Sequence, residues 1–114
     1  MKNKIATRDF SDEHEKSVCK ALNARQVPNS GAGLFTKGDC IIDSANMLVE
    51  CKCSMSEKKS FSIKKEWLEK MKEEQFANRL DCSSLCFNFE PNGKNYYVID
   101  ESLMKYLVEC LENS

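Results

Sequence analysis

Three residues in the middle of the chain could together perform metal-assisted hydrolysis: Asp39, Glu50 and Lys52. They belong to residues 38–53, which read as two short apolar strands joined by a tight turn. Residues two apart in a strand share a face, so Glu50 and Lys52 project together, away from the apolar side chains between them. Burying such charges costs free energy unless a partner or a metal compensates, so the pattern indicates a function.

The chemistry that suits these groups is hydrolysis with bound magnesium. Asp39 and Glu50, on adjacent strands, would offer carboxylate oxygens to Mg²⁺, for which Mn²⁺ is expected to substitute, and the backbone carbonyl of Cys51 would add another ligand. Lys52 would position, or help deprotonate, the water that attacks a phosphodiester. The alternative for Glu50 and Lys52 is a solvated ion pair on an exposed strand, but the apolar residues around them favour a central strand.

The spacing of these residues matches a known motif. Gly38-Asp39 followed by Glu50-Cys51-Lys52 resembles the PD-(D/E)xK nuclease superfamily, whose motif is an acid and, about a dozen residues later, Asp or Glu, any residue, and Lys. Gly38 stands where the motif's name has proline. The resemblance implies an α/β fold, namely a restriction-endonuclease-like sandwich with a central mixed sheet flanked by helices. It also implies a metal-dependent DNA endonuclease.

A helix is predicted to begin near residue 11 or 12 and to place a third acidic residue near the strands. Glu15 lies three to seven residues before the apolar positions of this helix, so it points toward the core along with them. His14 is expected at the surface. The apolar stripe consists of Val18, Cys19 and Leu22.

The position of Glu15 resembles that of the first-helix glutamate in archaeal-type and phage Holliday-junction resolvases, small members of the same superfamily. There this glutamate completes the active site. The resemblance therefore implies that Glu15 helps to bind the metal ion, either directly or through a water molecule. Two alternatives stay open. Glu15 can instead pair with an Asp12 N-cap in a capping box, or Glu13 can be the equivalent acid.

Lysines after the second strand indicate where DNA would bind. Residues 52–72 contain seven lysines and three glutamates, a local net charge of +4, whereas the whole chain has a net charge of -1. The alternative is a solvated helix face with Glu/Lys pairs. The resemblance adds a loop of Ser-Gly-x-Gly type at residues 30–33 that approaches a phosphate. The predicted DNA contacts are Ser30, Lys37, Lys58, Lys59, Lys64 and Lys65.

The remaining patterns complete one domain of 114 residues, in which residues 1–10 are expected to be loose. A helix over residues 63–80 follows the Glu-x-Lys strand, with an apolar stripe of Trp67, Leu68, Met71 and Phe76. Strands over residues 82–89 and 95–100 should form an antiparallel hairpin, and Ser102 should cap a closing helix. The predicted order is therefore helix, strand, strand, helix, strand, strand, helix.

Seven cysteines at irregular spacing indicate reduced thiols rather than a disulfide framework. We expect no disulfide and an intracellular, cytoplasmic protein of a bacterial host or phage. No segment resembles a membrane span or a secretory signal, so no membrane association is expected. A zinc site made of Cys51, Cys53, Cys82 and Cys86 is the alternative for the thiols. Its spacing is unusual, and no zinc is expected.

The resemblance to junction resolvases implies branched DNA as the substrate and a homodimer, because a four-way junction must be cut on two strands. Four aromatic residues could form the dimer interface or belong to the core: Phe87, Phe89, Tyr96 and Tyr97. Two other functions remain open: a nuclease of the same superfamily that acts on flaps, nicks or duplex DNA, and a DNA-binding module without catalysis on the same fold.

Overall fold

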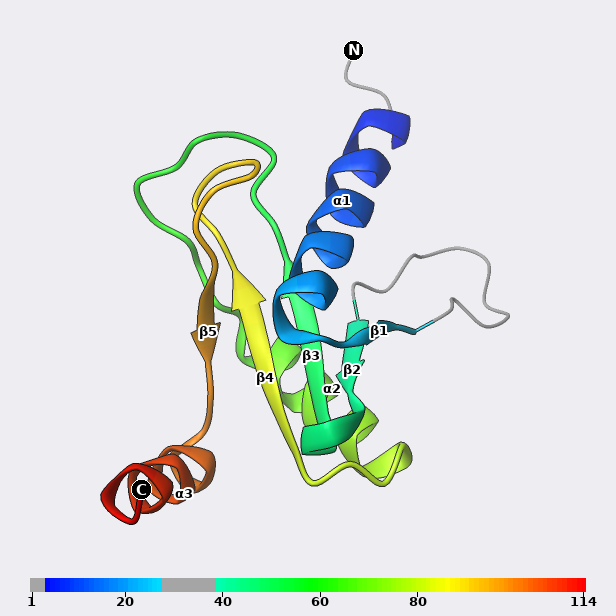
Figure 1. The fold of residues 1–114 in the computed structure, drawn as a ribbon. Coiled ribbons are helices and arrows are strands. Elements are labelled where there is room, and N and C mark those ends of the chain that lie inside the picture. The colour runs from blue at the N-terminus through cyan, green and yellow to red at the C-terminus, as the bar shows by residue number, and fades with distance from the viewer. Residues whose placement is uncertain (1–3, 28–38) are drawn as a thin grey trace.

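The computed structural model describes the backbone of residues 4–27 and 39–114, and the side chains of residues 12–27 and 40–114. These residues form a mixed five-stranded sheet and three α-helices (Figure 1). In chain order the elements are α1 (Lys4–Leu22), β1 (Arg25–Gln26), β2 (Asp39–Ile42), the 3-10 helix η1 (Asp43–Ala45), β3 (Met47–Lys52), α2 (Lys65–Ala77), β4 (Cys82–Phe87), β5 (Tyr96–Val98) and α3 (Glu101–Glu112).

The strands lie side by side in the order β1-β2-β3-β4-β5. The pairs β2–β3 and β4–β5 are antiparallel, as expected of hairpins, and β3–β4 is parallel. A parallel neighbour needs a crossover connection, which α2 supplies. The α/β class and the mixed sheet are thus confirmed. β1 was not predicted, because Arg25 and Gln26 are exposed polar residues without apolar alternation.

Helices cover both faces of the sheet, with α1 in front of it and α2 behind it in Figure 1. Successive residues of β3 point to opposite faces, and each face builds its own core. The α1 face consists of Val18, Cys19, Cys40, Ile42, Val49, Cys51 and Cys86. The α2 face consists of Ile41, Leu48, Met71 and Leu85, with Trp67, Phe87 and other half-buried residues around them.

The first helix is longer at its start than predicted. It begins at Lys4, so most of the segment expected to be loose is helical, and neither residue 11 nor Asp12 marks its start. Residues 4–12 contain no glycine or proline, so nothing in them stops a helix. The helix ends at Leu22, before left-handed Asn23 (φ 54°). The buried stripe of Val18 and Cys19 is confirmed.

A disulfide joins Cys19 of α1 to Cys40 of β2, so the prediction of only reduced thiols is wrong. The two Cα atoms lie 6.1 Å apart across a sequence separation of 21 residues. The pairing depends on α1 packing against β2, which spacing alone does not reveal. Of the free cysteines, Cys51 and Cys86 are buried, whereas Cys110 is exposed.

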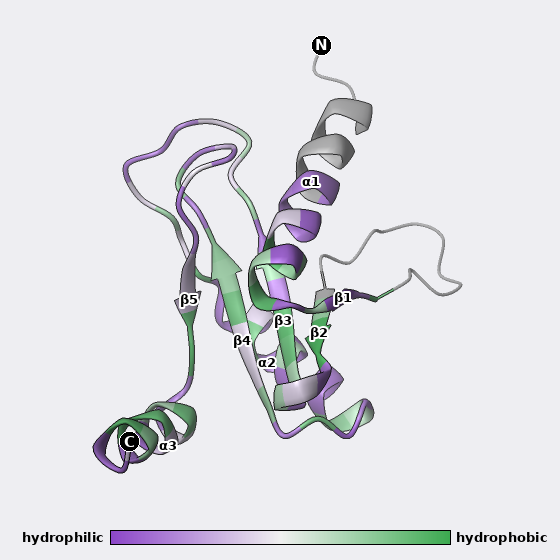
Figure 2. Ribbon diagram, viewed as in Figure 1, coloured by the Kyte–Doolittle hydropathy of each residue, from purple (hydrophilic) through white to green (hydrophobic). Residues whose placement is uncertain are grey.

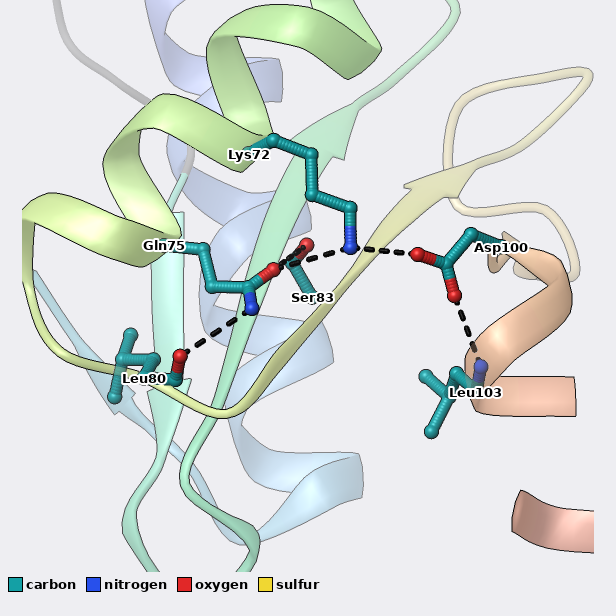
Figure 3. Close-up of polar contacts among 6 residues, drawn as sticks. All are labelled: Lys72, Gln75, Leu80, Ser83, Asp100 and Leu103. Carbon is teal, nitrogen blue, oxygen red and sulfur yellow. Dashed lines mark hydrogen bonds and ion pairs between the residues drawn. The ribbon is translucent and has the colours of Figure 1, made fainter. Parts of the chain in front are cut away.

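The second helix buries a short stripe that includes a polar residue. Met71 and Gln75 are buried, but Phe76, expected in the apolar stripe, is 73% exposed. Gln75 Oε1 accepts a hydrogen bond from Ser83 Oγ (2.7 Å), and Gln75 Nε2 donates to the Leu80 carbonyl (3.3 Å). These bonds fix the end of α2 against the start of β4 (Figure 3).

The third helix is attached mainly at its start. Asp100, not Ser102, is the N-cap, and its Oδ1 accepts a hydrogen bond from the Leu103 amide (2.9 Å). Lys72 Nζ of α2 lies 2.7 Å from Asp100 Oδ2 and donates to Gln75 Oε1 (3.3 Å) (Figure 3). Leu103 is the one buried residue of α3, all of which the structure describes.

Most of the apolar face of α3 is exposed, and Figure 2 shows its hydrophobic residues at the edge of the molecule. Tyr106 is 61% exposed and Leu111 is 75% exposed. The other exposed apolar residues of this helix are Met104, Leu107 and Val108. None of the helices in the described ranges is both long and apolar enough to cross a membrane.

Candidate active site

The β2–β3 hairpin places the two acids of the motif opposite each other. Asp39 and Glu50 are register partners in this antiparallel pair. Register partners of an antiparallel pair occupy the same face of the sheet, with Cβ atoms generally about 4.5–5.5 Å apart. Lys52 follows two residues after Glu50 and shares that face. The side chain of Asp39 lies outside the described residues, so its placement rests on the backbone register alone.

Lys52 is held between a carboxylate and an aromatic ring. Its Nζ lies 3.8 Å from Glu50 Oε2 and 4.7 Å from the centroid of the Trp67 ring of α2. The Glu50 side chain is 14% exposed and that of Lys52 is 32% exposed, so both are partly withdrawn from water. An ammonium at this distance from an indole face is attracted by the ring quadrupole. The two charged side chains are therefore positioned at the edge of the α2-side core.

Glu15 is the buried acid of α1. Only 2% of the residue is exposed. Its Oε1 accepts a hydrogen bond from Gln26 Nε2 (3.2 Å), and its Oε2 has no hydrogen-bond partner among the described residues. The pKa of Glu15 is raised to about 7, mainly by burial. The hydrogen bond from Gln26 opposes this rise, and the negative charges of Asp12 and Glu50 contribute to it. Glu15 and Glu50 therefore interact electrostatically although they come from different layers.

Asp12, Glu13 and Glu15 are close neighbours in α1 but differ in burial and in their partners. The capping-box alternative is wrong, because α1 begins at Lys4 and Asp12 lies well inside it. Asp12 instead pairs with Lys16, with 3.0 Å between Oδ2 and Nζ. Glu13 is exposed. Of the two glutamates, Glu15 is the one directed into the protein.

The donor set fits a hard divalent cation in chemical type. Among the described side chains, which do not include that of Asp39, no group of three His, Cys, Asp or Glu residues is arranged to hold a metal ion. Glu15 is buried with its Oε2 unpartnered, and it interacts electrostatically with Glu50. A bound cation would compensate the negative charge of these two carboxylates. The candidate ligands are thus Glu15, Glu50 and Asp39.

The predicted DNA contacts that the structure describes lie in the loop after β3 and at the start of α2. Lys58, Lys59, Lys64 and Lys65 are exposed. The amide of Lys58 donates to the Phe89 carbonyl (2.8 Å), which attaches this loop beside the end of β4. Lys64 is the N-cap residue of α2, and its Nζ lies 5.8 Å from the Trp67 ring centroid. Ser30 and Lys37 lie outside the described residues.

His14, expected at the surface, is buried on the α1 face of the sheet. Its Nε2 lies 2.9 Å from Asn95 Oδ1 and 3.8 Å from Cys86 Sγ. Burial lowers the pKa of His14, but hydrogen bonds with Cys53, Cys86 and Asn95 outweigh it and raise that pKa to about 10. His14 lies four residues before buried Val18, a helical spacing that could have predicted its burial.

A cavity of about 120 Å³ adjoins His14. Its walls come from α1, from the segment after β3 and from the segment between β4 and β5. The lining residues are His14, Ser17, Cys53, Ser54, Asn88, Pro91, Asn92, Gly93 and Asn95.

The zinc alternative is not assembled in this structure. Cys51 is the register partner of Cys86, but Cys82 is the partner of Met47, at the other end of the parallel pair. Four residues of strand separate Cys82 from Cys86 by about 13 Å, too far for one tetrahedral site. The side chain of Cys51 also lies in the α1-side core, away from Glu50 and Lys52.

Comparisons with protein-family models, with curated proteins and with solved structures found no match to this chain.

Proposed function

We propose that this protein is a metal-dependent DNA endonuclease that hydrolyses phosphodiester bonds in branched DNA, with four-way junctions as the preferred substrate. The observation that supports this most is the register of Asp39 with Glu50, together with Lys52 Nζ 3.8 Å from Glu50 Oε2. Two carboxylates and an amine at one point of a sheet are the groups that the nuclease motif requires.

The order of elements supports the same proposal. A helix precedes the hairpin that contains the acids, and a second helix, α2, leads from the Glu-x-Lys strand to a parallel neighbour. This is the arrangement that the PD-(D/E)xK resemblance implies, so we propose a restriction-endonuclease-like fold for the sheet and its two flanking helices.

In the proposed mechanism, Asp39 and Glu50 hold Mg²⁺, and Glu15 contributes directly or through a water molecule. The bound cation would act as a Lewis acid on the phosphodiester and favour ionisation of a coordinated water. Glu50 also orients the Lys52 ammonium, whose hydrogens can be donated to the attacking water or to a phosphate oxygen. Trp67 limits the freedom of the Lys52 side chain, so the amine is positioned before DNA binds.

A homodimer follows from the proposed substrate, because two strands of a junction must be cut. The exposed apolar face of α3 supports self-association, since monomeric proteins rarely expose a contiguous apolar surface of this kind. Tyr96 and Tyr97, which are 37% and 39% exposed, are the alternative interface. Sedimentation at micromolar concentration should give a dimer, and Leu107→Glu should shift it toward monomer if α3 is the contact.

Cleavage assays with purified protein test the nuclease proposal. A four-way junction, a flap and a linear duplex of the same sequence are incubated with Mg²⁺, with Mn²⁺ and with chelator. We expect metal-dependent cleavage that is fastest on the junction and is lost in Glu50→Gln. The matched control is Glu57→Gln, an exposed loop glutamate that should cleave like the unmodified protein.

Each outcome of these assays has a defined meaning. Faster cleavage of the flap or the duplex would replace the junction assignment with one of the other nuclease activities. If the protein binds DNA but cleaves none with either Mg²⁺ or Mn²⁺, the remaining function is that of a DNA-binding module without catalysis. In calorimetry, Mg²⁺ binding should weaken strongly in Asp39→Asn, and unchanged binding would remove Asp39 from the site.

A further inference from the structure

Five aromatic rings form a continuous cluster on the α2 face of the sheet, next to the proposed active site. Phe87 lies at the centre, with its ring centroid 5.0 Å from Phe61, 5.5 Å from Phe89 and 5.9 Å from Tyr96. Phe61 also contacts Trp67 at 6.2 Å. We call these five residues the aromatic patch.

The aromatic patch is open to solvent rather than sealed in the core. Tyr96 is 37% exposed, and the other four rings are half-buried. The rings come from the loop after β3, from α2, from β4 and the residues after it, and from β5. α3 does not lie over this group, because it follows the end of β5 opposite Tyr96 (Figure 1).

Three lysines lie over rings of the patch. Lys52 and Lys64 approach the Trp67 ring, and Lys94 Nζ lies 5.7 Å from the Tyr96 ring centroid. Among the residues whose side chains are described, no acidic partner lies in ion-pair contact with Lys64 or Lys94. Their ammonium groups are therefore available to an anionic ligand while their alkyl chains stay beside the rings.

The patch is continuous with the catalytic face. Lys52 of β3 is the register partner of Phe87 of β4, and Phe87 is the partner of Tyr96 of β5. These three residues form a row across three strands on the face that also presents Glu50. A strand whose phosphodiester lies at Glu50 and Lys52 would meet the rings within the next few nucleotides.

Flat rings interleaved with free cations match one ligand chemistry: nucleobases that can stack, joined by phosphates. Stacking on an aromatic side chain contributes about 1–3 kcal/mol per base and tolerates any sequence. Paired bases cannot reach such rings, because their faces are already stacked in the duplex. We propose that the aromatic patch binds unpaired nucleotides of the DNA strand that enters the active site.

This inference rests on the proposed function only in taking DNA as the substrate, and it narrows the substrate class. The preferred substrate would be branched DNA that has a few unpaired nucleotides next to the cleaved phosphodiester bond. Open junctions, forks and flaps share this feature, whereas a fully paired duplex lacks it.

Binding of single-stranded DNA in chelator tests the proposal without cleavage. A labelled oligo(dT) is titrated with the whole protein, and the single tryptophan, Trp67, gives a second signal through its fluorescence. We expect Phe89→Leu and Tyr96→Leu each to weaken binding roughly tenfold, since each removes a stacking ring and keeps an apolar side chain. The matched control is Phe76→Leu, an exposed ring at the end of α2 outside the patch, which should bind like the unmodified protein.

A charge variant gives an independent readout. Lys94→Gln should lower the slope of log affinity against log salt by about 0.7, the contribution of one phosphate contact on a single strand. Equal affinity of Tyr96→Leu, Phe89→Leu and the unmodified protein for oligo(dT) would overturn the proposal, as would tighter binding to duplex than to oligo(dT). Oligo(dT) binding with the expected variant effects, but no cleavage with metal, would support the patch and refute the nuclease. Cleavage of fully paired branched DNA without any binding of oligo(dT) would support the nuclease and refute the role of the patch.

Discussion

The two faces of β3 differ in what they contain, although they alternate along six residues of one strand. Toward α1, Val49 and Cys51 are buried in an apolar core closed by a disulfide. Toward α2, the face begins with buried Leu48 and then changes to Glu50 and Lys52, half-buried beside Trp67. The first face supplies stability. The second gives up apolar burial at its end, where charged groups can meet a substrate.

The largest expected effect concerns the charged face. Lys52→Met should lower kcat for cleavage by about 10²–10⁴-fold, the range for loss of a group that assists proton transfer. Its free energy of unfolding should fall modestly, because the Glu50 carboxylate loses its partner, although the pair is partly exposed and methionine keeps an apolar chain beside Trp67. Single-turnover cleavage and urea unfolding measure the two quantities. The control is Lys70→Met, an exposed lysine of α2 outside the predicted DNA contacts, and unchanged kcat in Lys52→Met would remove the lysine from the mechanism.

Glu15 belongs to the α1 layer, but the negative charge of Glu50 raises its pKa. The titration of Glu15 therefore depends on a group on the other face of β3. Its folded-state pKa is raised from 4.5 to about 7. A raised carboxyl pKa means that stability present below about pH 4.5 is lost as the pH rises through about 7. In chelator, the loss should be on the order of 3 kcal/mol.

Urea unfolding from pH 4.5 to 8 measures this loss. The fall in the free energy of unfolding with rising pH should disappear in Glu15→Gln. It should persist in Glu13→Gln, because Glu13 is exposed. Added Mg²⁺ should reduce this fall, since a cation favours the ionised carboxylate. A pH profile identical in the unmodified protein and Glu15→Gln would contradict the interaction between the two layers.

The disulfide gives the α1 face a constraint that the α2 face lacks. Reduction of Cys19–Cys40, or the variant Cys19→Ser, should lower the free energy of unfolding by up to about 3 kcal/mol, from the loop entropy of a closure of this length. Cleavage per folded molecule should be retained, since neither cysteine contacts the charged groups of β3. Equal unfolding midpoints with and without reductant would show that this bond adds no stability.

The sequence predicted the parts of the fold that depend on local periodicity. The hairpin of β2 and β3, the crossover helix and the pairing of β4 with β5 all come from alternation, helical spacing and turn residues. The register of Asp39 with Glu50 follows from the same pattern, since a tight turn fixes which residues face each other.

Features that depend on packing between distant segments were missed. The Cys19–Cys40 bond and the burial of His14 arise only when α1 lies on the sheet. The start of α1 was misplaced because a polar helix turn has no apolar stripe to signal it. Phe76 was expected inside, but in the last turn of α2 it is Gln75 that faces the sheet and is buried, so the neighbouring Phe76 points to solvent.

The smallest effect is expected at Val49, the chain neighbour of Glu50 that points the opposite way. Val49 is fully buried, and Val49→Ala removes two methyl groups and leaves a cavity, so the free energy of unfolding should fall by about 2 kcal/mol. Cleavage per folded molecule should not change, because the side chain faces α1. Glu50→Gln, one residue further, should show the reverse: stable protein without cleavage. A loss of kcat in folded Val49→Ala equal to that of Glu50→Gln would mean that the two faces of β3 do not act separately.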